Sequence, residues 1–222
     1  METPIKIKIC GITRIEDLLC AVNAGVDALG FVFYPHSPRY LAPQQAAQLL
    51  QHLPPFLTSV GLFVNPSIEE VSAVIKVAPI QLLQFHGDET PEQCAAIADA
   101  VNRPFISAFR VKTDTKPIDL LEYEASYRAA SRFFQGLLLD TYVDSFGGSG
   151  KVFDWSLIPK ELAPRVVLSG GLSVQNATDA VVRVRPFALD ISSGVELAKG
   201  IKDAAKVQAF VTAVRLAQSV RS

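Results

Sequence analysis

The stretch IKIKICGITRIEDLLCAVNAGVDALGFVF, residues 5–33, contains one complete strand–helix–strand unit. The apolar runs 5–10 and 28–33 are typical of buried parallel strands. Between them, the apolar residues of 15–22 fall on one face of a helix, which Gly25 is expected to close. Two strands joined by a helix of this length predict a parallel sheet covered by helices.

The same unit recurs along the whole chain. Eight short apolar runs begin every 21 to 31 residues, at 5–10, 28–33, 59–64, 80–85, 105–109, 136–140, 166–169 and 187–191. The segments between them carry helix-start signals: Thr13 with Glu16, Ser67 with Glu70, Thr90 with Gln93, and Ser173 and Asp203 as caps of the last two long helices. The segment 154–159, between the sixth and seventh runs, predicts only a short piece of helix.

This alternation continues without a linker or a change in composition. It predicts an α/β protein with a single (β/α)8 TIM barrel over residues 1–222. A doubly wound open sheet is the alternative, because alternation alone does not show that the sheet closes. A chain of this length buries roughly 70% of its extended surface on folding, so it needs no disulfide or metal for stability.

Composition excludes several classes of protein. Lys and Arg total 21 against 22 for Asp and Glu, so the chain lacks the basic excess of a non-specific nucleic-acid binder. Three cysteines without CxxC spacing, and no HxH or HExxH pattern, argue against a disulfide framework, a metal site or a metal cofactor. The N-terminus has no apolar signal-peptide core, and glutamines and prolines interrupt the uncharged segment 41–68. We expect a cytoplasmic protein with no nucleic-acid, membrane or obligatory protein partner.

Cys10 and Asp140 are the candidate acid–base pair. Each ends an apolar run, and the C-terminal ends of barrel strands form the face where active sites lie. We expect the N-terminal dipole of the following helix to favour the thiolate of Cys10, although an arbitrary cysteine is more often a buried hydrophobe. A carboxyl group at Asp140 reduces stability unless it is paired or used.

Two Gly/Ser clusters follow the last two runs. They are Ser169, Gly170 and Gly171 after the seventh run, and Ser192, Ser193 and Gly194 after the eighth. Backbone N–H groups in glycine-rich loops hold phosphates well, and the loops after strands seven and eight are a frequent phosphate position in barrels. One cluster alone is more often a plain turn, but the two together predict a phosphate site.

Two further features have both a structural and a functional interpretation. FGGSGK at 146–151, with Gly147 and Gly148, is either a surface loop or a lid over the ligand; Ser145 and Val152 exclude a P-loop. His86 follows the fourth run, where it either contacts the ligand or is a hydrogen-bonded structural residue. No local spacing supports a hydrolase triad.

Seven motifs resemble the phosphoribosylanthranilate isomerase family of tryptophan biosynthesis. They are KICGIT at 8–13, GFVFYPHSPRY at 30–40, LFVNP at 62–66, QFHGDE at 84–89, LLLDTYVDSFGGSGKVFDW at 137–155, VVLSGGL at 166–172 and ALDISSGVE at 188–196. They cover nearly the whole chain in family order. The length resembles the stand-alone form of the enzyme.

The resemblance implies an Amadori rearrangement of N-(5-phosphoribosyl)anthranilate to 1-(2-carboxyphenylamino)-1-deoxyribulose 5-phosphate, without a cofactor. It implies Asp140 as the general acid and Cys10 as the general base. It also implies that Arg39 binds the anthranilate carboxylate, which a guanidinium can clamp, and that Asp190 supports the substrate. His86, Gly147 and Gly148 complete the expected substrate contacts.

Two alternatives stay open from the sequence. One is another phosphosugar barrel enzyme, such as the histidine-pathway Amadori isomerase, which is expected to use two aspartates; Cys10 argues against it. The other is a non-catalytic barrel that only binds a phosphorylated ligand.

Overall fold

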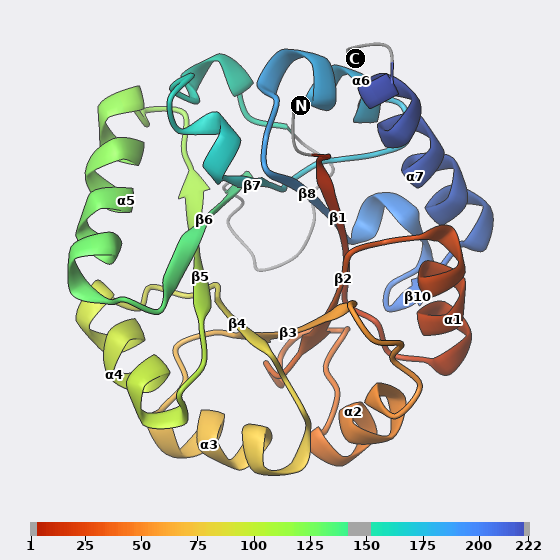
Figure 1. The fold of residues 1–222 in the computed structure, drawn as a ribbon, viewed down its shortest axis with the longest axis vertical. Coiled ribbons are helices and arrows are strands. Elements are labelled where there is room, and N and C mark those ends of the chain that lie inside the picture. The colour runs from red at the N-terminus through yellow and green to blue at the C-terminus, as the bar shows by residue number, and fades with distance from the viewer. Residues whose placement is uncertain (1–3, 142–151, 220–222) are drawn as a thin grey trace.

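Eight parallel strands form a closed barrel in chain order in the computed structural model, which describes residues 4–141 and 152–219 (Figure 1). The strands are β1 (Lys6–Cys10), β2 (Ala28–Val32), β3 (Thr58–Phe63), β4 (Leu82–Phe85), β5 (Phe105–Val111), β6 (Phe134–Thr141), β7 (Val167–Leu168) and β8 (Ala188–Ile191). Closure comes from the pairing of β1 with β8. The predicted barrel is therefore confirmed, and the open-sheet alternative is wrong.

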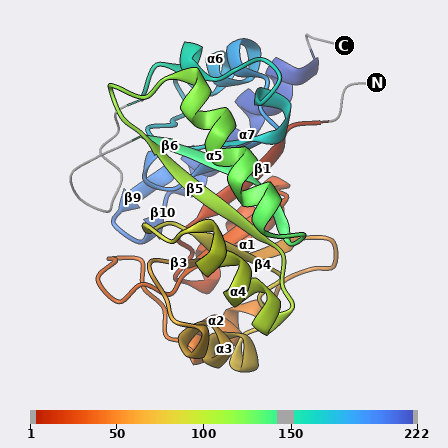
Figure 2. The ribbon, with the colours of Figure 1, turned by 90° about the vertical axis from the view of Figure 1, so that its left-hand side faces the viewer.

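Helices surround the barrel on its outside (Figure 1). They are α1 (Ile15–Ala24), α2 (Pro43–Leu50), α3 (Ile68–Val77), α4 (Pro91–Val101), α5 (Pro117–Ala130), α6 (Ala177–Asp179) and α7 (Ala204–Ser219). Two 3-10 turns, Trp155–Leu157 and Ala163–Arg165, replace a long helix between β6 and β7, as 154–159 predicts. After β8, a 3-10 turn at Ser193–Val195 leads into a hairpin of β9 (Glu196–Ala198) and β10 (Ile201–Lys202), which extends beyond one end of the barrel (Figure 2).

Three predicted helix starts are confirmed. The Ser67 hydroxyl accepts a hydrogen bond from the amide of Glu70, and the Thr90 hydroxyl accepts one from Gln93. Asp203 accepts bonds from two amides in the first turn of α7. These caps satisfy donors that have no partner within the helix.

The cap predictions at Thr13 and Ser173 are wrong. Helix α1 starts at Ile15 and has Arg14 at its N-cap, because the Thr13 hydroxyl instead donates to the carbonyl of Gly200. The expected long helix after Ser173 is only the short α6, followed by a π-helical turn at Ala180–Val184. The amide of Ser173 donates to the Asn176 side chain, so it belongs to the loop before α6.

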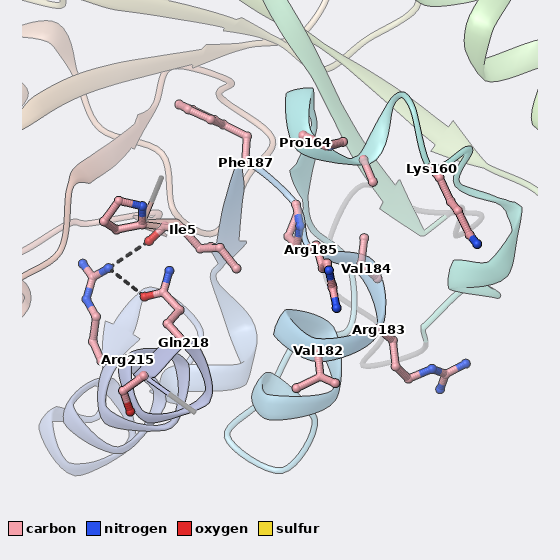
Figure 3. Close-up of a pocket in the computed structure, with 14 residues that line it drawn as sticks. Ile5, Lys160, Pro164, Val182, Arg183, Val184, Arg185, Phe187, Arg215 and Gln218 are labelled. Carbon is pink, nitrogen blue, oxygen red and sulfur yellow. Dashed lines mark hydrogen bonds between the residues drawn. The ribbon is translucent and has the colours of Figure 1, made fainter. Parts of the chain in front are cut away.

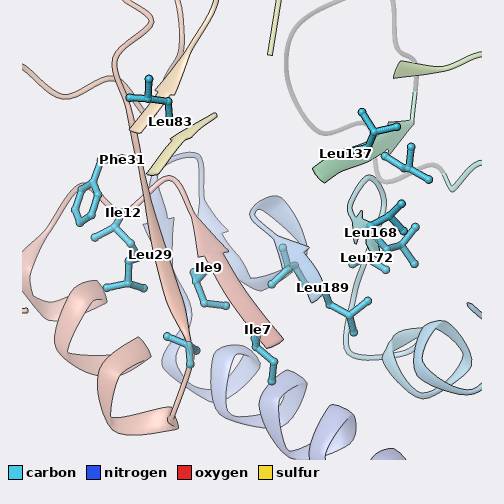
Figure 4. Packing of buried hydrophobic residues seen from close by; sticks show 14 of the residues in the cluster. Ile7, Ile9, Ile12, Leu29, Phe31, Leu83, Leu137, Leu168, Leu172 and Leu189 are labelled. Carbon is cyan, nitrogen blue, oxygen red and sulfur yellow. The ribbon is translucent and has the colours of Figure 1, made fainter. Parts of the chain in front are cut away.

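Alternation along each strand separates two apolar layers. The larger layer lies between strands and helices and includes Ile7 and Ile9 of β1; Figure 4 shows part of it. The second lies inside the barrel and contains Ile106, Ala108, Leu138, Val167 and Ala188. Residues two apart on a strand share a face, so Lys8 and Cys10 lie on the inner side, opposite Ile7 and Ile9.

No helix in the described part of the chain is both long and apolar enough to cross a bilayer.

Candidate active site

Cys10 lies at the C-terminal end of β1 beside a buried ion pair. Lys8 and Asp190 are register partners on β1 and β8, and the Nζ of Lys8 lies 2.8 Å from Oδ1 of Asp190. Both residues are only about 5% exposed, Lys8 at 5% and Asp190 at 4%. Burial disfavours the ammonium, but attraction to Asp190 and Cys10 and hydrogen bonds to both together raise the pKa of Lys8 above its ordinary value.

The expected effect of a helix dipole on Cys10 is wrong. Helix α1 begins only at Ile15, so a four-residue loop separates Cys10 from its first turn, where a dipole acts. Burial raises the pKa of the Cys10 thiol, Lys8 and Lys202 oppose that rise, and Asp190 adds to it. Burial has the larger effect, so the pKa of the thiol lies above its ordinary value, and the ammonium groups of Lys8 and Lys202 limit this rise.

Arg39 forms a buried ion pair of its own. Its Nε and Nη2 donate to the two carboxylate oxygens of Glu196, both at 2.7 Å, and Lys202 donates to the same carboxylate at 2.9 Å. Burial alone would raise the pKa of Glu196, but these two cations hold it below its ordinary value. Two of the five guanidinium donors of Arg39 are used in this way, so its remaining donors can bind a ligand carboxylate.

Arg39 also packs directly over Gly11. A Cβ at Gly11 would lie 2.4 Å from Cδ of Arg39, and Gly11 has a φ of +78°. Only glycine fits this backbone conformation and this close approach. Arg39 is thereby held next to the loop that follows Cys10.

Asp140, at the end of β6, is held by two hydrogen bonds. Its Oδ1 accepts from the amide of Thr141 at 2.9 Å, and its Oδ2 lies 3.0 Å from Nε2 of His86. The amide nitrogen of Gln84 donates to Nδ1 of His86 at 3.0 Å, so Nε2 carries the proton that His86 donates to Asp140. The structure therefore brings His86 and Asp140 together through a chain that starts at the buried Gln84.

The two Gly/Ser loops pack against each other and against Asp140. A Cβ at Gly194 would lie 2.0 Å from the carbonyl oxygen of Leu172, and one at Gly170 would lie 2.5 Å from Oδ1 of Asp140. Gly170 and Gly171 both have positive φ. Ser192 donates its hydroxyl to the carbonyl of Cys10 at 2.9 Å, which ties the eighth loop to the first.

Backbone donors are available in these loops. Among the described residues, the amides of Gly170, Gly171, Ser193 and Gly194 have no hydrogen-bond partner, while the amide of Ser169 belongs to the barrel sheet. These glycines and serines are half-buried. Such N–H groups are suited to a phosphate. Gly147 and Gly148 lie outside the described residues.

Four residues of this region were missed by the sequence reasoning: Lys8, Gln84, Glu196 and Lys202. For Lys8 and Gln84 a signal existed: Lys8 stands two positions before Cys10 on β1 and shares its face, and Gln84 stands two positions before His86, which directly follows β4. Glu196 and Lys202 had no such signal, since the β9–β10 hairpin brings them to Arg39 only in the folded chain. In the described part of the chain, no cluster of three or more His, Cys, Asp or Glu side chains is arranged to hold a metal.

A pocket of about 1050 Å³ opens at the opposite end of the barrel (Figure 3). Ile5 and Phe187, which line it, directly precede β1 and β8. Arg183, Arg185 and Arg215 also line it, and Arg215 donates to the carbonyl of Ile5 at 2.8 Å. This pocket lies away from Cys10 and Asp140, so it is not the candidate active site.

Comparison with known proteins identifies the family. The family model described as N-(5'phosphoribosyl)anthranilate (PRA) isomerase matches residues 7–213. This chain belongs to the N-(5'-phosphoribosyl)anthranilate isomerase family. A curated member from Herminiimonas arsenicoxydans is 69% identical over 222 residues, covering 99% of this chain and 98% of the relative.

Solved structures of the family share the barrel. The crystal structure of phosphoribosyl anthranilate isomerase from Thermotoga maritima has a TM-score of 0.83 and 42% identity, covering 95% of this chain and 98% of that one. A second family structure holds reduced 1-(o-carboxyphenylamino)-1-deoxyribulose 5-phosphate; its TM-score is 0.80 and its identity 39%, with 95% and 98% coverage. That bound compound contains a phosphate and a carboxylate.

Proposed function

We propose that this chain catalyses the Amadori rearrangement of N-(5'-phosphoribosyl)anthranilate to 1-(2-carboxyphenylamino)-1-deoxyribulose 5-phosphate in tryptophan biosynthesis. Family membership supports the reaction. One observation supports assigning this reaction to particular residues: Cys10 and Asp140 end non-adjacent strands at the same end of a closed barrel. A substrate lying between β1 and β6 can meet a base on one side and an acid on the other.

The chemistry needs two proton transfers. Asp140, in its protonated form, gives a proton to the ring oxygen of the furanose; the bond from that oxygen to C1' breaks and leaves a protonated Schiff base. The Cys10 thiolate then takes the proton from C2', and the electron pair moves to form an enolamine. Protonation at C1' and loss of the proton from the C2' hydroxyl complete the ketone. Each acid–base role contributes about 10²–10⁴-fold to the rate.

Binding uses the two ends of the substrate. The amides of Gly170, Gly171, Ser193 and Gly194, which have no partner among the described residues, hold the 5'-phosphate, with Ser169 and Ser192 alongside. The free donors of Arg39 hold the anthranilate carboxylate. His86 orients Asp140 and contacts the substrate, and Asp190 supports the substrate through Lys8. The substrate contacts expected of Gly147 and Gly148 stay a prediction, because both lie outside the described residues.

The test is an assay of the folded protein with N-(5'-phosphoribosyl)anthranilate, in which the decay of the substrate's fluorescence measures turnover. Turnover of this substrate, with none of the histidine-pathway aminoaldose, supports the proposal. Turnover of the second substrate alone would assign the chain to the rival isomerase. Binding without turnover would make it a non-catalytic phosphate-binding barrel.

A further inference from the structure

The Lys8–Asp190 pair lies inside the barrel, where an ion pair gives little net stability. Its side chains are only 6% and 5% exposed. A buried ion pair is often no more stabilising than apolar residues of the same volume, because desolvation opposes the attraction. The inner apolar cluster contains Ile106, Ala108, Leu138 and Ala188 from other strands, so a buried charged pair inside the same barrel calls for another explanation.

Gly30 provides the space in which Lys8 approaches Cys10. Gly30 is the register partner of Cys10 on β2. A Cβ at Gly30 would lie 2.8 Å from Sγ of Cys10 and 3.0 Å from Nζ of Lys8. The thiol and the ammonium therefore converge on one small volume that a side chain at Gly30 would fill.

The charges around Cys10 come from four elements. They are Lys8 on β1, Asp190 on β8, Arg39 after β2, and the hairpin residues Glu196 and Lys202. Among these residues, Lys8 pairs with Asp190, while Arg39 and Lys202 share the single carboxylate of Glu196. With all five ionised, this cluster carries one positive charge in excess, and a thiolate at Cys10 neutralises it.

We propose that Lys8 is a positioning residue for the base. Its ammonium is held by Asp190, lies in the space left by the missing side chain of Gly30, and stabilises the Cys10 thiolate. This inference rests on the proposed role of Cys10 as the base. Lys8 acts through Cys10 and does not itself take the substrate proton.

The experiment titrates the thiol itself in the full-length chain. With Cys20→Ser and Cys94→Ala, Cys10 is the remaining thiol, and its ionisation is followed by ultraviolet absorbance and by alkylation rate against pH. Lys8→Met is expected to raise the apparent thiol pKa by about one unit or more, equal to a tenfold or larger loss of thiolate below that pKa. The acid limb of the kcat/KM profile should move upward in pH by the same amount.

Three variants provide the controls. Lys8→Arg keeps the positive charge, so the thiol pKa should stay close to that of the wild type. Lys6→Met removes an ammonium that pairs with Asp27 near the surface, and it should leave the thiol pKa unchanged. Asp190→Asn should lower the thiol pKa, an effect opposite in sign to that of Lys8→Met. If Lys8→Met fails to fold because Asp190 is left unpaired, Lys8→Met with Asp190→Asn removes both charges and should still raise the pKa.

The outcomes separate this inference from the proposed mechanism. An unchanged thiol titration in Lys8→Met, or in the double variant, would overturn the role of Lys8. A shifted titration together with full activity of Cys10→Ser would support the action of Lys8 on the thiol and overturn Cys10 as the base.

Discussion

At the scale of single residues, the candidate acid and the candidate base lie in different environments. Asp140 is half-buried and held by the Thr141 amide and by His86. Cys10 is buried, and its ionisation depends on that burial and on nearby charges. Groups whose environments differ in this way can perform opposite proton transfers at one pH.

Replacing either group should affect turnover and not affinity. Cys10→Ser and Asp140→Asn each retain the size of the side chain, so kcat should fall by about 10²-fold or more while KM changes little. Steady-state kinetics measures both, and Cys20→Ser, a change at a half-buried helix position, is the matched control. Loss of affinity with a normal kcat would show that the replaced residue binds substrate and transfers no proton.

Arg39 should behave as an anchor. Arg39→Ala removes a charge-assisted contact, so KM should rise by an amount equivalent to about 1.5–3 kcal/mol. A substrate analogue without the carboxylate should be bound equally by the wild type and this variant. Arg14→Ala, which breaks an ion pair with Asp17 on the outside of the barrel, is the control and should leave KM unchanged. If Arg39→Ala still discriminates the two ligands as the wild type does, another residue holds the carboxylate.

At the scale of elements, the loops after β7 and β8 form one unit. Gly194 meets the Leu172 carbonyl, and Asn176 donates to the carbonyl of Gly171 at 3.0 Å, so each loop restrains the other. Loops that restrain each other, and whose amides have no partner among the described residues, can bind an anion with little loss of conformational freedom. The strands set this geometry, because β7 and β8 are neighbours in the barrel.

Substitutions at Gly171 test whether the loops after β7 and β8 bind phosphate. It has a φ of +68°, so Gly171→Ala should weaken phosphate competition moderately, and Gly171→Asp should nearly abolish it by adding a repelling charge. The measurement is inhibition of the isomerase by inorganic phosphate or sulfate.

Gly25→Ala is the matched control for backbone strain. Gly25 has a φ of +81° with open space around it, and it ends α1 before β2, away from the loops. This variant should lose stability and keep normal phosphate competition. Unaltered competition in Gly171→Asp would place the phosphate elsewhere on this end of the barrel.

At the scale of the whole molecule, the β9–β10 hairpin links the site to stability. Glu196 of the hairpin joins Arg39 after β2 to Lys202, and the amide of Lys202 donates to Asp17 of α1. These contacts connect the last part of the chain to the first. Loss of the central carboxylate charge should therefore affect global unfolding.

The stability of the protein should fall in acid partly through Glu196. Its folded pKa lies below its ordinary value of 4.5, although burial alone would raise it, because Arg39 and Lys202 favour the carboxylate. The unfolded chain then binds more protons than the folded one, so this stabilisation is present above pH 4.5 and is lost as the pH falls through the folded pKa. Urea unfolding at several pH values should show that Glu196→Gln lowers the free energy of unfolding at pH 7 and flattens its decline in acid. Glu161→Gln, at an exposed position, is the control; an equally steep acid decline in Glu196→Gln would exclude this group as a source.

The strands, most helices and the strand-end positions of Cys10 and Asp140 could be predicted from local sequence alone. Runs such as 28–33, caps such as Ser67 with Glu70, and the positions of Cys10 and Asp140 at strand ends depend on residues close in the chain. Side-chain periodicity and capping are local physical effects, so a sequence carries them directly.

Contacts between distant residues were decided only by the tertiary structure. Closure of the barrel requires β1 to meet β8, and the same closure pairs Lys8 with Asp190 across 182 positions of sequence. Thr13 was expected to cap α1, but its hydroxyl bonds to Gly200, a partner that no local pattern indicates. The pKa of Cys10 follows the same rule: a four-residue loop separates it from α1, while Asp190 from β8 raises this pKa and Lys202 from the hairpin lowers it. Electrostatic interactions depend on distance in space and on burial, and the chain acquires both only when it folds.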